Sequence, residues 1–155
     1  MAGPTYQIEV KELPRQPIVS IRQETTPRGL GAAFRELLPV LYAYLEDRGV
    51  RAAGPSFGIF HAYEADRVEV QAGFPVPEPL EGEGRVEAGE LPGGRAAVAV
   101  HVGPYDTIGA VHDALERFVG ERGGSGGPPR EVYWTGPGQE SDPARWRTEV
   151  VYPLA

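Results

Sequence analysis

The residues best suited to chemistry are a carboxylate and a phenol two positions apart, in Glu131-Val132-Tyr133-Trp134. In a β-strand, residues i and i+2 share a face, so Glu131 and Tyr133 should lie together, with Trp134 on the other side. A carboxylate among aromatic rings favours a lipophilic cation, through charge pairing and cation–π contact. The alternative is a glutamate that faces solvent.

Four further residues are candidates for the same site. Tyr105, in Gly103-Pro104-Tyr105, stands before a helix and either overlooks a cleft or packs against the helix start. Glu149 is a second cleft carboxylate or an edge-strand charge that discourages aggregation. Trp146 is a cap over a sheet or a cleft, and Phe60 is a further stacking wall.

Common catalytic motifs do not occur in the sequence. It has no Gly-x-Ser-x-Gly, no phosphate-binding GxxxxGK[ST], no GxGxxG after a strand and no His-Glu-x-x-His. His61, His101 and His112 are well separated, and Asp113, next to His112, should point to a different helix face. We therefore predict no metal site and no cofactor, and interpret the histidines as surface or partly buried structural residues.

Composition limits the partners. The 155 residues carry 22 acidic and 15 basic side chains, a net charge of −7, which argues against nucleic acid or an anionic membrane surface as a direct partner. The sequence has no cysteine, no export leader and no apolar run of about 18 residues. We expect one domain over residues 1–155, located in the cytoplasm, with a homodimer left open.

The elements that position these residues follow a duplicated pattern. At a shift of 78 residues, Glu12-Leu13-Pro14 recurs as Glu90-Leu91-Pro92, and Leu30-Gly31-Ala32 meets Ile108-Gly109-Ala110. Apolar periodicity predicts a helix from Thr26-Pro27 to Gly49 and a second over 107–120. Strands are expected at 6–11, 18–24, 57–63, 68–74, 95–102, 131–135 and 148–153, with a loop over 75–89.

Each half therefore reads as β-β-α-β-β, over about 6–79 and 84–155. The predicted class is α+β, with antiparallel sheets, two long helices and pseudo-twofold symmetry. A ligand cleft is expected between the repeats. In the repeat alignment Glu131 replaces Gly58 and Tyr133 replaces Phe60, so only one half carries the carboxylate.

The chain resembles the GyrI-like (gyrase-inhibitor-like) small-molecule-binding family, whose module also serves as the effector-binding domain of AraC- and MerR-type multidrug regulators. The resemblance covers about Tyr6 to Leu154. It rests on the duplicated plan together with Leu91-Pro92-Gly93-Gly94, Gly103-Pro104-Tyr105, Glu131-x-Tyr133 and Thr148-Glu149-Val150-Val151-Tyr152-Pro153. It implies aromatic, often cationic ligands around a glutamate, here Glu131, with Tyr105 as the aromatic and Glu149 as the last-strand acid. No helix-turn-helix precedes the domain, so we expect the stand-alone form.

Three functions follow as hypotheses. The leading one is a multidrug-binding protein that sequesters or senses lipophilic aromatic or cationic compounds, with Glu131 as counter-ion. The second is a hydrolase of cyclopropane-bearing or other electrophilic natural products, as some family members resemble, with Glu131 as general acid/base and Tyr105 beside it. The third is a gyrase-interacting inhibitor protein.

Overall fold

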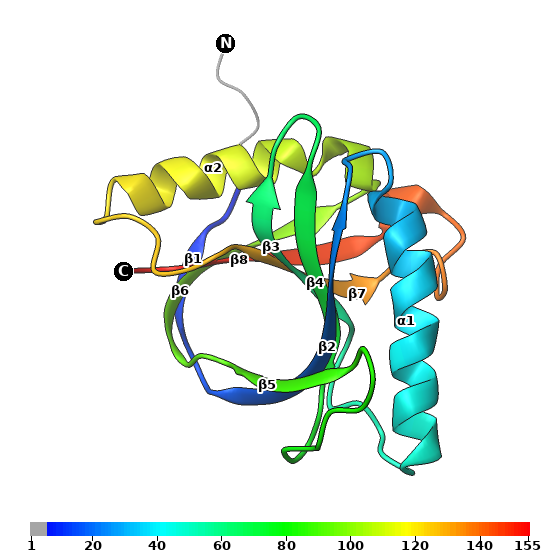
Figure 1. Cartoon of the computed structure of the whole chain (residues 1–155). Helices are drawn as coiled ribbons and strands as arrows, with labels where there is room; N and C mark the ends of the chain where they lie inside the picture. The colour runs from blue at the N-terminus through cyan, green and yellow to red at the C-terminus, as the bar shows by residue number, and fades with distance from the viewer. Residues whose placement is uncertain (1–5) are drawn as a thin grey trace. The chain divides into compact units, whose positions relative to one another are not determined.

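The computed structural model describes residues 6–155, which form eight strands and two α-helices in two compact units. Unit 1 combines the chain up to Leu13 with Gly94–Ala155, and unit 2 is Pro14–Gly93 (Figure 1). All strand pairs described within the two units are antiparallel. The predicted α+β class is therefore confirmed.

Unit 1 is a four-stranded sheet that carries one helix. Its strands follow the order β1-β6-β8-β7, and helix α2 is preceded by a short 3-10 turn, η1. A second 3-10 turn, η2, leads into β8. The bounds are β1 Glu9–Leu13, β6 Gly94–Val102, η1 Tyr105–Thr107, α2 Gly109–Gly120, β7 Arg130–Thr135, η2 Pro143–Arg145 and β8 Arg147–Pro153.

Unit 2 has the same construction. Its strands follow the order β3-β4-β2-β5, and helix α1 packs on them. The bounds are β2 Gln16–Thr25, α1 Leu30–Asp47, β3 Phe57–Tyr63, β4 Val68–Pro75 and β5 Glu87–Leu91.

Each helix is held by an apolar stripe at helical spacing. In α2 the buried residues Val111, Leu115 and Val119 are four positions apart, so they lie on one side of the helix. They pack on alternate residues of β6 and β8, which defines the helix-covered face of unit 1. The sheet residues of this core are Ala97, Ala99, Val150 and Tyr152.

The register of the strands follows the shift of 78 residues. Ala99 lies opposite Val150 in unit 1, and Ile21 lies opposite Ala72 in unit 2; each residue is 78 positions from its counterpart. A residue of one unit can therefore be matched to the residue that occupies the same place in the other.

The first strand of each sequence repeat, however, joins the unit built mainly from the other repeat. In Figure 1, β1 lies beside β6 in unit 1, and β5 lies beside β2 in unit 2. The expected loop over 75–89 is wrong at its end, because β5 begins at Glu87. Alternation in a sequence indicates which face a residue occupies, but it does not identify the neighbouring strand.

The predicted helix starts also differ from the structure. Helix α1 begins at Leu30 rather than Thr26, because the Thr26 carbonyl and hydroxyl both accept the Gly29 N–H, each at 3.0 Å, in a turn. Gly49 follows the helix at φ +63°, as predicted for a terminating glycine. Neither helix of the described chain is long and apolar enough to span a membrane.

Candidate functional site

Glu131 lies on the helix-covered face of unit 1, at strand β7. It is paired in register with Val150, a member of the core under α2, and residues directly opposite in an antiparallel pair share a face. Only 8% of Glu131 is exposed. A carboxylate this buried needs partners, because an unpaired buried charge is strongly unfavourable.

Both carboxylate oxygens of Glu131 have a partner. The Tyr133 hydroxyl donates to Oε1 at 2.9 Å, which confirms that Glu131 and Tyr133 share a face. On the other side, Nε2 of His112, from α2, lies 2.6 Å from Oε2. Glu131 is thus held between its own strand and the helix above it.

The hydrogen-bonded chain continues beyond His112. The other ring nitrogen, Nδ1, lies 2.7 Å from the Tyr152 hydroxyl on β8. Burial raises the pKa of the Tyr152 hydroxyl, and the negative charge of Glu116 on α2 adds to the rise. Burial also raises the pKa of Tyr133 well above its usual value, reinforced by the charge of Glu131. Both phenols therefore stay protonated near neutral pH and can donate.

An aromatic wall stands beside the carboxylate. The Tyr105 ring meets Tyr133 edge-to-face, with centroids 5.9 Å apart, and packs against Trp146 at 5.0 Å. Tyr105 is 37% exposed, so one ring of the wall reaches solvent. Burial and the charge of Glu131 both raise the pKa of Tyr105, which places its hydroxyl within the field of the carboxylate.

The turn that carries Tyr105 is fixed by main-chain contacts. The Gly103 N–H donates to the Trp146 carbonyl at 2.8 Å, and His101 Nε2 lies 2.9 Å from the Pro104 carbonyl. Gly103 has φ +131°, a conformation open to glycine and strained for other residues. The Gly-Pro-Tyr sequence therefore sets the ring of Tyr105 against Trp146.

One buried hydroxyl on this face is unsatisfied. Thr148 is fully buried, lies opposite Tyr133, and within residues 6–155 its Oγ1 finds no hydrogen-bond partner. Such a group is uncommon in native proteins. It adds a polar position next to the carboxylate and the aromatic wall.

Two of the predicted residues are not part of this cluster. Glu149 is paired with Val132 and Val100, and β8 lies between β6 and β7, so it is not on an edge strand as one alternative had it. Alternation puts Glu149 on the face away from α2, where its charge acts on the buried Arg130. Phe60 belongs to unit 2, in a cluster with Val68 and Val70.

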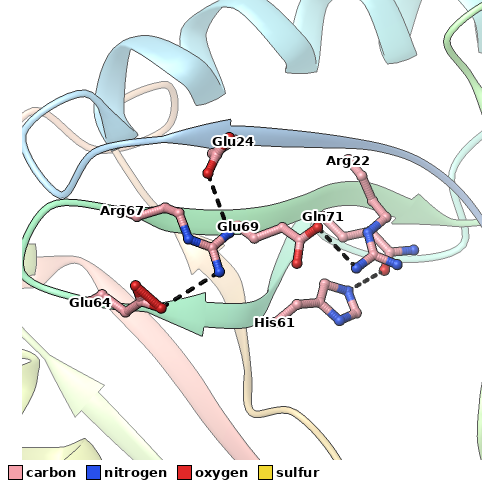
Figure 2. Close-up of polar contacts among 7 residues, drawn as sticks. All are labelled: Arg22, Glu24, His61, Glu64, Arg67, Glu69 and Gln71. Carbon is pink, nitrogen blue, oxygen red and sulfur yellow. Dashed lines mark hydrogen bonds and ion pairs between the residues drawn. The ribbon is translucent and has the colours of Figure 1, made fainter.

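The face of unit 2 away from α1 is polar and largely self-paired, as Figure 2 shows. Arg67 bridges Glu24 and Glu64, and Arg22 pairs with Glu69. His61 contacts Gln71 at 2.8 Å, and Gln71 donates onward to Ser20. These charges neutralise one another at the surface, where such pairs contribute little.

Sequence reasoning missed His112 as the partner of Glu131. The shift of 78 residues held the signal, since it places His112 on Phe34 and Tyr152 on Phe74, both packed against the apolar core of unit 2. With Gly58 in the place of Glu131, one unit keeps an apolar site and the other replaces it with an acid, an imidazole and a phenol. No group of three or more potential metal ligands forms within residues 6–155.

The family is now clear from comparison. A model of the GyrI-like small molecule binding domain matches residues 6–155, and the chain belongs to this family. No protein with a curated description matches the sequence.

Solved structures share the fold. The EcmrR C-terminal domain superposes with a TM-score of 0.88 at 24% identity, covering 97% of this chain and 98% of that one. In the EcmrR–DNA complex the chain spans 57% of the EcmrR protein. A hydrolase from Listeria innocua gives 0.71 at 15% identity, over 98% and 93%. SAV2435 bound to tetraphenylphosphonium gives 0.64 at 10%, over 96% and 94%.

Proposed function

We propose that the protein binds lipophilic aromatic compounds, often cationic, on the helix-covered face of unit 1, in sequestration or sensing. The observation that carries the proposal is a buried carboxylate, Glu131, beside the rings of Tyr133, Tyr105 and Trp146. Such a combination attracts a cation whose charge is spread over aromatic groups, because ring faces and carboxylate act in the same direction.

The similarity to SAV2435 supports the choice of probe. That protein was solved with tetraphenylphosphonium, a permanent cation with four phenyl groups. For this chain we expect the phosphonium charge near Glu131 and a phenyl group against Tyr105, the exposed ring of the wall. The proposal needs residues of unit 1 alone.

The test uses the fluorescence of Trp146. The chain has two tryptophans, and Trp134 is 56% exposed, so Trp134→Phe leaves Trp146 as the single reporter. Quenching by tetraphenylphosphonium is then measured in this background with Glu131→Gln. The matched control is Glu149→Gln, the same change on the opposite face of the same sheet.

At an effective dielectric constant near 20, a charge about 5 to 6 Å from Glu131 is attracted by about 3 kcal/mol. We expect Glu131→Gln to weaken binding by about 30- to 150-fold, and Glu149→Gln by less than threefold. Equal affinity in the wild type and Glu131→Gln would remove Glu131 from the proposed role.

A hydrolase is the second candidate, favoured by the hydrogen-bonded pair of Glu131 and His112. Such a pair can hold and release a proton, as general acid/base chemistry requires. The phenol that contacts Glu131 is Tyr133, so it replaces Tyr105 as the nearest hydroxyl. Incubation with a cyclopropane-bearing alkylating agent and mass spectrometry tests turnover; stoichiometric binding without product would exclude hydrolysis of that compound.

A further inference from the structure

His112 occupies the position next to Glu131 where a cationic ligand would place its charge. Its side chain is 19% exposed and that of Glu131 is 11% exposed, so both groups are largely removed from water. The contact between Nε2 and Oε2 is 2.6 Å, short for a nitrogen–oxygen hydrogen bond and typical of a charge-assisted one.

The hydrogen atoms in this chain can be counted. Each of the two contacts of the imidazole, to Glu131 and to Tyr152, requires one hydrogen. The Tyr152 hydroxyl has a single hydrogen, and Glu116 also accepts a hydrogen bond from it. If that hydrogen goes to Glu116, then Nδ1 of His112 must carry its own and donate to Tyr152, while Nε2–H donates to Glu131.

The charges around the imidazole favour the same state. Glu131 faces it from β7, Tyr152 faces it from β8, and Asp113 and Glu116 of α2 act on Tyr152. Tyr133 and Tyr105 act on the cluster through Glu131 and remain neutral, since burial raises the pKa of each. Among these described neighbours every charged group is acidic. The nearby cation of β7, Arg130, belongs to the opposite face, with Glu149.

We infer that His112, as an imidazolium, is the internal counter-ion of Glu131, and that an organic cation binding at Glu131 displaces one proton from this pair to solvent. The inference rests on the proposed function and specifies how that site is regulated. The exchange balances: one cation enters, one proton leaves, and the charge of the buried site is unchanged. Keeping both would bury a second positive charge beside one carboxylate, which is strongly unfavourable.

The exchange gives the site a defined pH response. Where the pair is protonated, the affinity for a permanent cation rises up to tenfold per pH unit, because protons compete with the ligand. Above the pH at which the pair gives up its proton, the affinity becomes constant. A neutral aromatic ligand does not displace the proton, so its affinity stays flat.

The experiment is calorimetric titration of the whole protein with tetraphenylphosphonium, whose charge does not vary with pH, from pH 5.5 to 8.5. Buffers of different ionisation enthalpy report the number of protons released. Triphenylphosphine oxide is the neutral control ligand. His112→Gln keeps an N–H donor but cannot take up a proton, and His61→Gln, in unit 2, is the matched control.

At the acid end we expect release of close to one proton per phosphonium ion and an affinity that rises about tenfold per pH unit. His112→Gln should bind without proton release and with constant affinity between pH 6 and 8. Binding by the wild type with no proton release would overturn the exchange and leave the proposed function intact. Failure to bind at any pH would contradict the proposed function and the exchange with it.

A second measurement does not depend on how His112→Gln folds. Nitrogen-15 spectra of the three imidazoles in the wild-type protein at pH 6 distinguish the charged ring from the neutral one. We expect tetraphenylphosphonium to convert one imidazole from charged to neutral. Binding that leaves the charge of all three imidazoles unchanged would overturn the inference.

Discussion

The pairing of Glu131 with His112 should be measurable as a coupling free energy. Replacing His112 with Phe, the residue at the equivalent position in unit 2, fills the space but removes the donor 2.6 Å from the carboxylate. Glu131 would then be buried without its charged partner. Breaking a buried pair on one side typically costs 3 to 5 kcal/mol, and we expect about 3 kcal/mol here, because Tyr133 still donates.

Glu131→Gln in the same background removes the unpaired charge. The double variant should therefore be more stable than His112→Phe alone, with a coupling free energy of about 2 kcal/mol between the two positions. Urea unfolding at pH 7.5, followed by far-ultraviolet circular dichroism, gives the four stabilities of the cycle. A coupling below about 0.5 kcal/mol would refute the argument that the imidazole compensates the buried carboxylate.

Three further outcomes are expected. Leu115→Ala, at a fully buried position of α2, should destabilise the protein by about 2 to 5 kcal/mol in the same urea assay. A Cβ on Gly136 would lie 2.8 Å from the Tyr105 hydroxyl, so Gly136→Ala should weaken phosphonium quenching of Trp146, whereas Gly138→Ala, with nothing described within 4 Å, should not. Because burial raises the pKa of Tyr133 in the folded state, its contribution to stability is complete below about pH 10 and is lost above it. Urea unfolding from pH 8 to 11 should show a smaller alkaline loss in Tyr133→Phe than in the wild type.

Much of the local structure could be predicted from the sequence. Strand β3 has the predicted bounds, and helix α2 buries the predicted stripe through Val111, Leu115 and Val119. Local periodicity decides these features, because side chains three or four apart meet on a helix and those two apart meet on a strand. The exchange of β1 and β5 could not be predicted in this way, since strand partners are distant in sequence.

The candidate site shows the same limit. That Glu131 and Tyr133 share a face follows from their spacing, and the structure confirms it. That Glu149 faces away from them depends on the register between β7 and β8, which alternation within either strand does not determine. His112 was within reach of the sequence only by comparing the repeats position by position, where an imidazole stands on Phe34.

The central claim is that Glu131, under helix α2, is where a lipophilic cation binds. A crystal structure of the protein with tetraphenylphosphonium tests it most directly. We predict the phosphorus atom on the helix-covered face of unit 1, within about 6 Å of a ring of the aromatic wall, and nearer to Glu131 than to Glu149. A phosphonium ion bound on the face of Glu149, or away from the strands of unit 1, would contradict the account.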